Sequence, residues 1–276
     1  MKFGQSSILN QSFKPLPEIE YWFDDVDNQS NTYFGSTNWT QDYWKGTLYP
    51  LKTKPTEYLN LYSKFFTTIE LNTTFYRIPS PEQVIKWKNQ TSDNFHFCPK
   101  IPAIISQSKL LGTDNQLWQE FGSVIQKFDN KLGSSFMQLP EHFDSSKFSV
   151  IEKLLHGDFL LNNTLIELRH ESWFKNSEIL KNLCALLGTK GHGLIITDTP
   201  GRQDVLHMNI CCSNLLVRFV SNGILADDQL RISAWLVQIK LLIKKGINNI
   251  FFIFHHPDAS TMIKIADTMK KSINDN

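Results

Sequence analysis

The feature that most constrains the fold is a repeated alternation of short apolar segments with longer amphipathic segments, which begins at Thr32. The apolar segments have the length and the β-branched and aromatic content of buried strands, and the segments between them show helical spacing. Eight strands are predicted, at residues 32–35, 67–71, 95–98, 134–139, 164–168, 193–197, 215–219 and 250–254. They recur roughly every 30–35 residues, which is typical of a (β/α)8 barrel of the TIM type.

The segments between the strands predict the helices. Apolar residues have helical spacing at residues 55–66, 84–87, 117–128, 148–155, 179–187, 230–243 and 260–273. The interval between Asp198 and Leu215 is too short for a full helix, so the sixth helix is expected to be short or missing. An open doubly wound sheet is the alternative fold, but no Gly-rich phosphate-binding turn follows the first strand. We therefore predict a single α/β barrel domain at residues 32–276.

Residues 1–31 precede this pattern and are predicted to be a polar N-terminal extension. They contain Pro15 and Pro17 and an acidic group formed by Asp24, Asp25 and Asp27. Such a segment is expected to pack on the outside of the domain or to be partly mobile.

Composition narrows the classes of partner and compartment. The net charge is 28 − 27 = +1, so no long-range field attracts polyanions, and a nucleic-acid partner is unlikely although not excluded. No apolar run reaches the length of a membrane span, and no membrane partner is expected. The four cysteines form no Cys-x-x-Cys pair, which favours a reduced, cytoplasmic protein. The sequence leaves the oligomeric state open.

Polar side chains stand at the end of every predicted strand. In a barrel of parallel strands these ends meet at one face, where the active site lies. The residues are Asn38, Trp39, Glu70, Asn72, Lys100, Gln138, Glu167, Arg169, His170, Asp198, Arg218, His255 and His256. Burial of such groups costs free energy unless they are paired, so their convergence predicts a functional site.

The carboxylates at these ends are the candidates for catalysis. Glu70 and Glu167 stand three strands apart and are expected to face one another, as general acid and base or as a glycosidase-like pair. His170 and Asp198 complete the catalytic candidates, with His170 or His255 carrying a proton. The alternative is that each glutamate forms an internal ion pair, for example with Arg77, Lys100 or Arg169.

The cations are the candidates for substrate binding. Lys100, Arg169 and Arg218 can hold a phosphate or carboxylate group, and the alternative is that they pair with Glu70, Glu167 and Asp198. Polar orienting groups and aromatic side chains that can stack on a sugar or base, or pack over the domain, complete the predicted binding residues: Asn72, Gln138, His255, Trp39, Tyr76 and Trp173.

No cofactor is predicted, and a divalent metal remains possible. Its ligands would be Glu167, Asp198, His255 and His256, which are side chains of the types that bind divalent ions. No His-x-x-x-His spacing or cysteine cluster supports a metal site.

Several segments together resemble the DUF72 (YecE-like) family of uncharacterised barrel proteins. They are residues 35–39, 45–50, 69–80, 131–133, 136–140, 167–174 and 198–199. The segments Glu-x-Asn-x-x-Phe-Tyr from Glu70 and Glu-x-Arg-His-x-x-Trp-Phe from Glu167 are specific in combination. The resemblance implies a barrel fold and a site at the strand ends, and it implies no reaction.

The chain departs from the pattern of this family at three strand ends. Residues 105–107 read Ile-Ser-Gln where the family often has Ile-Thr-His, and residues 218–221 read Arg-Phe-Val-Ser in place of Arg-Leu-His-Gly. At the last strand, residues 255–258 read His-His-Pro-Asp in place of paired asparagine or aspartate residues. Two imidazoles are lost and two are gained, so the pH and metal behaviour of the family does not carry over directly.

The leading functional hypothesis is an enzyme of hydrolase, lyase or isomerase type that acts on a small anionic substrate. One alternative is a metal-dependent phosphodiesterase or nuclease, which rests on analogy to other barrels. The other is a non-catalytic protein that binds a metabolite and needs the cations without the carboxylates.

Overall fold

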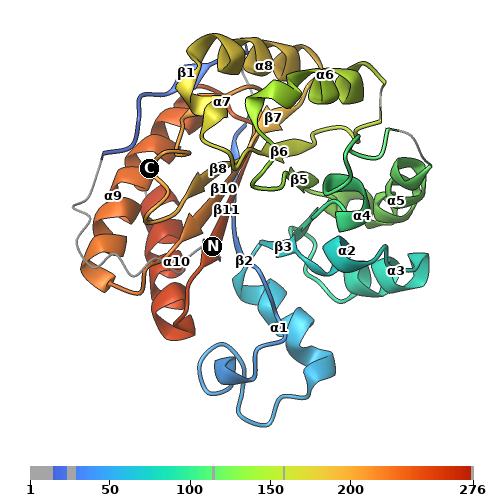
Figure 1. Cartoon of the computed structure of the whole chain (residues 1–276). Helices are drawn as coiled ribbons and strands as arrows, with labels where there is room; N and C mark the ends of the chain where they lie inside the picture. Colours follow the sequence, from blue (N-terminus) through green and yellow to red (C-terminus); the bar gives the residue numbers. More distant parts are fainter. Residues whose placement is uncertain (1–14, 24–28, 114–115, 158, 275–276) are drawn as a thin grey trace.

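The computed structural model describes residues 15–23, 29–113, 116–157 and 159–274 (Figure 1). Most of the predicted N-terminal extension, including the acidic group of Asp24, Asp25 and Asp27, lies outside the described residues.

All eight predicted strands are present, and the sixth is divided in two. The strands are β2 (Asn31–Ser36), β3 (Thr68–Leu71), β4 (His96–Pro99), β5 (Phe136–Gln138), β6 (Leu165–Glu167), β7 (Gly193–Leu194), β8 (Ile196–Asp198), β10 (Asn214–Val220) and β11 (Asn249–His255). Every pairing between them is parallel. The short apolar segments therefore identified the strands, since buried parallel strands are apolar on both faces.

The strands form two parallel sheets. One has the order β4-β3-β2-β11-β10-β8 and the other the order β5-β6-β7. Single bridges, Phe97 with Leu132 and Lys100 with Phe136, connect the β4 edge to the region of β5. At the other junction, Ile195 separates β7, which pairs with β6, from β8, which pairs with β10. The fold is thus a mixed α/β domain of mainly parallel strands, in which two sheets stand where a single closed sheet was predicted.

Helices surround the strands, with α9 and α10 on one side, α3 and α5 on the other, and α6 and α8 beside each other at the top of the view (Figure 1). The longer ones confirm the predicted helices: α1 (Tyr58–Phe65), α3 (Pro81–Asn89), α5 (Leu117–Ile125), α6 (Phe148–His156), α8 (Ser177–Thr189), α9 (Leu225–Lys244) and α10 (Ala259–Asn274). No helix in these parts of the chain is long and apolar enough to cross a membrane. Caps mark two starts, since Ser80 Oγ accepts from Gln83 N before α3, and Asn176 Oδ1 accepts from Glu178 N before α8.

Short helices follow three strands and were not predicted. They are α2 (Thr73–Tyr76), α4 (Ala103–Ser106) and α7 (Ser172–Lys175), which follow β3, β4 and β6. Four residues are too few to show helical periodicity in a sequence.

Residues 199–213, all of which the structure describes, contain no helix, as predicted for the interval after the sixth strand. They contain β9 (Asn209–Ile210), which pairs in parallel with β1 (Glu20–Tyr21) of the N-terminal extension. Trp22 Nε1 also donates to Asn209 Oδ1 at 3.0 Å. The described part of the extension therefore packs against this interval.

The core is divided by the strands. A large cluster lies between strands and helices, and a smaller one among the strands consists of Cys98, Phe136, Leu165, Ile195, Cys212, Leu216, Phe251 and Ile253. At the contact of β2 with β3, a Cβ on Gly35 would lie 2.1 Å from the Thr68 carbonyl oxygen. Only glycine permits this close approach of the two strands, so Gly35 holds β3, which carries Glu70, against β2.

Candidate active site

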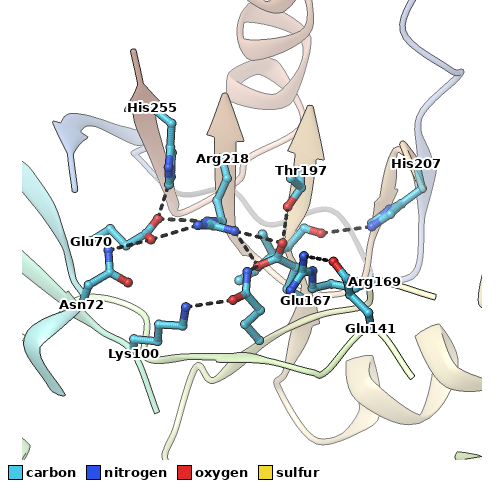
Figure 2. Close-up of polar contacts among 12 residues, drawn as sticks. Glu70, Asn72, Lys100, Glu141, Glu167, Arg169, Thr197, His207, Arg218 and His255 are labelled. Atoms are coloured by element: carbon cyan, nitrogen blue, oxygen red, sulfur yellow. Dashed lines mark hydrogen bonds and ion pairs between the residues drawn. The ribbon is translucent and has the colours of Figure 1, made fainter. Parts of the chain in front are cut away.

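The centre of the site is the guanidinium of Arg218 from β10, which lies between Glu70 of β3 and Glu167 of β6 (Figure 2). Arg218 Nε and Nη2 donate to the two Glu70 oxygens at 2.9 and 3.0 Å. Arg218 Nη1 donates to both Glu167 oxygens at 2.9 and 2.8 Å. All three side chains are buried. The glutamates therefore face one another as expected, but through an arginine that both of them bind.

This arrangement fixes the charge of the central groups. Burial by itself would raise the pKa of Glu70, but Arg218 and then His255 outweigh it and hold that pKa well below the usual range. Burial would likewise lower the pKa of Arg218, but Glu167 and Glu70 raise it. Glu70 is therefore ionised at neutral pH.

Glu70 also binds the imidazole of His255, which comes from the end of β11. His255 Nε2 lies 3.0 Å from Glu70 Oε2, and Asn72 Nδ2 donates to Glu70 Oε1 at 3.0 Å. An ionised carboxylate only accepts hydrogen bonds, so Nε2 carries the proton of this contact and Nδ1 is the free acceptor of the neutral ring. The His255 side chain is 20% exposed, whereas Glu70 is fully buried. The imidazole therefore connects the buried cluster to the surface.

Glu167 connects to Lys100 through an amide. Gln138 Nε2 donates to Glu167 Oε2 at 2.8 Å, and Lys100 Nζ donates to Gln138 Oε1 at 2.8 Å. Thr197 Oγ1 donates to Glu167 Oε1 at 2.9 Å. The buried Lys100 ammonium has no ion-pair partner among the described residues, and it lies 4.4 Å from the centre of the Phe75 ring. Burial, with Arg218 second, lowers the pKa of Lys100.

The three predicted anion-binding cations do not form an open floor. Arg218 is fully engaged by the glutamates, and Arg169 Nη2 lies 2.5 Å from Glu141 Oε1. Lys100 and Arg218 carry two positive charges, which balance Glu70 and Glu167. For Arg218 the structure thus has the ion-paired arrangement that the sequence left as the alternative, and it corrects the expectation that Arg218 is open to substrate. Arg169 is also ion-paired, but with Glu141, which the sequence did not indicate as its partner.

Asp198 belongs to a different cluster. Its Oδ1 lies 2.8 Å from Arg231 Nη2 of α9, and its Oδ2 accepts from Trp235 Nε1 at 2.9 Å. Arg231 also binds Asp228, whose Oδ2 lies 3.6 Å from His256 Nε2. Sequence reasoning missed Arg231 and Asp228 because both lie in a helix and not at a strand end.

This division separates the predicted metal ligands. Glu167 lies with Arg218, His255 with Glu70, and Asp198 and His256 with Arg231 and Asp228. Among the residues that the structure describes, no group of three or more His, Cys, Asp or Glu side chains lies so as to hold a metal ion. The predicted ligand set is therefore not brought together.

His170 is also separate from the central cluster. Its Nδ1 lies 2.8 Å from Ser172 Oγ and accepts from Ser172 N at 3.2 Å, at the start of α7. His255, and not His170, is thus the imidazole that binds a catalytic candidate.

Trp173 is a core residue, which corrects its predicted role in stacking on a substrate. It is fully buried, its ring stacks on Phe143, and its Nε1 donates to the Phe143 carbonyl oxygen at 2.8 Å. The Glu-x-Arg-His-x-x-Trp-Phe segment placed it near the strand end, but α7 turns its ring inward.

Replacement of Trp173 by Phe is expected to lower the free energy of unfolding by about 1–3 kcal/mol, because it leaves a small cavity and removes one buried hydrogen bond. Chemical denaturation measures this change. Binding of any ligand found for the protein should keep its affinity, and a weakened affinity with unchanged stability would contradict the assignment to the core.

Trp39 and Tyr76, in contrast, line a pocket of about 330 Å³ beside the central cluster. Tyr76 is 83% exposed, and Trp39 makes a T-shaped contact with Trp87, with 5.9 Å between ring centres. The wall also includes Thr37, Asn38, Thr40, Glu70, Leu71, Asn72, Thr73 and Arg77. Arg77 was considered only as an ion-pair partner of a glutamate, a role that Arg218 fills.

Comparison with known proteins shows that residues 33–276 match the model of the family DUF72, described as 'Protein of unknown function DUF72'. The UPF0759 protein YecE of Escherichia coli is 26% identical over 232 residues, which cover 76% of this chain and 84% of YecE. The UPF0759 protein YunF of Bacillus subtilis is 27% identical over 51% of this chain and 52% of its own length.

Solved structures share the fold. A DUF72 family protein from Thermotoga maritima matches with a TM-score of 0.70 and 20% identity, over 88% of this chain and 99% of that one. One from Enterococcus faecalis matches with a TM-score of 0.68 and 19% identity, over 88% of this chain and 96% of the other. At these identities the likeness concerns the fold alone.

Proposed function

The chain belongs to the DUF72 family of proteins of unknown function, and from the geometry at its strand ends we propose that it is an enzyme that performs acid–base chemistry on a small anionic substrate. The observation that carries this proposal is the hydrogen bond between the partly exposed His255 and the buried, ionised Glu70. An imidazole held by a carboxylate is a common device for proton transfer near neutral pH.

Each neighbour of this pair has a role in the proposal. His255 Nδ1 accepts a proton from the substrate, and the ionised Glu70 stabilises the imidazolium that forms. Arg218 and Asn72 keep Glu70 ionised and oriented. Glu167, held by Arg218, Gln138 and Thr197, positions the arginine from the opposite side.

An anionic substrate is favoured by positive charge in the site that no carboxylate contacts directly. Lys100 Nζ is held by the neutral Gln138 amide and supplies positive charge within the site. An anion that approached Arg218 would have to displace a buried carboxylate, which costs several kcal/mol.

The proposal includes a closed (β/α)8 barrel and a reducing compartment. The Lys100–Phe136 bridge and the direct succession of β7 and β8 support joining of the two sheets into one barrel, with the cluster at its carboxyl end. The four cysteines, all buried and free, support the cytoplasm as the site of action.

The metal-dependent hydrolase and the non-catalytic binding protein are the rival functions. The distribution of Glu167, Asp198, His255 and His256 over separate contacts does not favour the first. The second predicts ligand binding without any turnover.

A screen of phosphorylated and carboxylated metabolites, with product formation followed by mass spectrometry, tests the proposal. We expect at least one substrate to be turned over by the wild-type protein and not by His255→Gln at equal protein concentration. Equal product from the two proteins would refute the assigned role of His255. Binding of such a metabolite with no product in either protein would favour the binding protein.

A further inference from the structure

We propose that the pocket formed by Trp39, Tyr76, Arg77 and the segments around them binds a monosaccharide that carries a phosphate group. The inference rests on the proposed function in one respect, because it names the substrate class for that site. Its ground is separate, since it comes from the pocket wall and not from the Glu70–His255 pair.

The position of the pocket brings a ligand to the reacting groups. It lies between the segment after β2, which carries Asn38 and Trp39, and the segment after β3, which carries Asn72 and Tyr76. Glu70 borders it, so a ligand there lies beside the residues that bind Arg218 and His255. Its volume of about 330 Å³ is at the small end of the range for ligand sites.

The wall has the polar groups that a sugar requires. Asn72 donates through Nδ2 to Glu70, so its Oδ1 remains as an acceptor. Asn38 Oδ1 accepts from Thr40 N and Thr40 Oγ1, both at 2.8 Å, so its Nδ2 remains as a donor. These fixed amides offer hydrogen bonds to hydroxyl groups without first having to be ordered.

The aromatic part of the wall completes the sugar site. Trp39 makes a T-shaped contact with Trp87, and Tyr76 is largely exposed at the pocket. Rings of this kind offer an apolar face to the C–H groups of a pyranose or furanose ring. Hydroxyl and amide side chains outnumber the aromatic ones in this wall, which favours a sugar over a nucleobase.

Arg77 supplies the site for the phosphate. It is exposed on the pocket wall, just after α2, and the described residues give it no ion-pair partner. Arg169, Arg202, Arg218 and Arg231, by contrast, each bind a carboxylate. An unengaged guanidinium binds phosphate with two parallel hydrogen bonds, so Arg77 is the cation that can bind without breaking an existing pair.

Isothermal titration calorimetry of the full chain tests this site. The probes are ribose 5-phosphate and glucose 6-phosphate, with ribose, glucose, inorganic phosphate and adenosine 5′-monophosphate as partial or competing ligands. We expect at least one sugar phosphate to bind more tightly than its neutral sugar, than inorganic phosphate and than the nucleotide.

Replacement of Arg77 by Met is expected to weaken binding of the sugar phosphate by about ten- to a hundredfold, because hydrogen bonds between charged groups are lost. Its unfolding transition should match that of the wild type. Lys86→Met removes an exposed cation of α3 outside the pocket and should leave the affinity unchanged. Trp39→Ala should weaken binding of the sugar phosphate and of the neutral sugar by similar factors.

Three results would overturn the inference. They are no binding of either sugar phosphate, an Arg77→Met affinity equal to that of the wild type, and tighter binding of the nucleotide than of any sugar phosphate. The sugar-phosphate site and the proposed acid–base function can be tested separately, because His255→Gln should bind the sugar phosphate as tightly as the wild type does. Normal binding without turnover in the wild-type protein would leave the site intact and remove the catalytic proposal.

Discussion

Replacement of Arg218 by Met should lower the free energy of unfolding by about 3–5 kcal/mol, the usual cost of removing one partner from a buried ion pair. The variant leaves Glu70 and Glu167 buried without the guanidinium that contacts all four of their carboxylate oxygens. His255, Asn72, Gln138 and Thr197 still donate to them, but none matches the charge of the arginine.

The pH dependence of stability should change sign in this variant. In the wild type, the pKa of Glu70 is well below its unfolded value, so the stability that it contributes is present above pH about 4.5 and is lost on acidification. Without Arg218, burial is the largest remaining influence and raises the pKa of Glu70. The stability difference between the variant and the wild type should therefore shrink as the pH falls from neutral toward 4.5, the ordinary pKa of a glutamate.

Urea denaturation at several pH values measures both effects. Arg202→Met is a matched control, because Arg202 binds the more exposed Asp204 and should cost about 1 kcal/mol or less. Glu70→Gln/Glu167→Gln/Arg218→Met should recover part of the loss, since it buries no charge of this set. Equal stability of Arg218→Met and the wild type at neutral pH would contradict the central role of Arg218.

The sequence predicted the strands and the convergence of polar residues for the same physical reason. Buried parallel strands are apolar over most of their length, so an ionisable residue late in such a run indicates its carboxyl end. Glu167 is the last residue of β6, and Arg218 lies two residues before the end of β10. Since these ends lie at one face, Glu70 and Arg218 meet although 148 residues separate them. Strand position thus predicts which residues share a face.

The pairings within that face could not be predicted in the same way. The sequence places several cations at the same ends of the strands as the two glutamates. The length and direction of the side chains decide which of them pair. Arg231 reaches Asp198 from the interior of α9, where no strand pattern indicates it. The short helix α7 turns Trp173 inward, and four residues give no periodicity from which to predict that turn.

Replacement of His255 by Gln should lower kcat by about 10²–10⁴-fold on the substrate that the screen identifies, because that is the range for loss of a general acid or base. Glutamine can still donate a hydrogen bond to Glu70, but its amide cannot accept and release a proton near neutral pH. KM should change little, because His255 is not among the residues that line the pocket of Trp39 and Arg77, and the variant leaves that wall unchanged.

Steady-state kinetics over a range of pH separates a catalytic role from a structural one. The wild-type rate should fall on acidification, because a protonated imidazole cannot act as a base, whereas the residual rate of His255→Gln should lack this dependence. His256→Gln is the matched control, since His256 is the adjacent residue but faces Asp228, and its kcat should stay within a few-fold of the wild type. If both variants lose the same activity, the effect comes from the strand end as a whole, and His255 has no separate part in proton transfer.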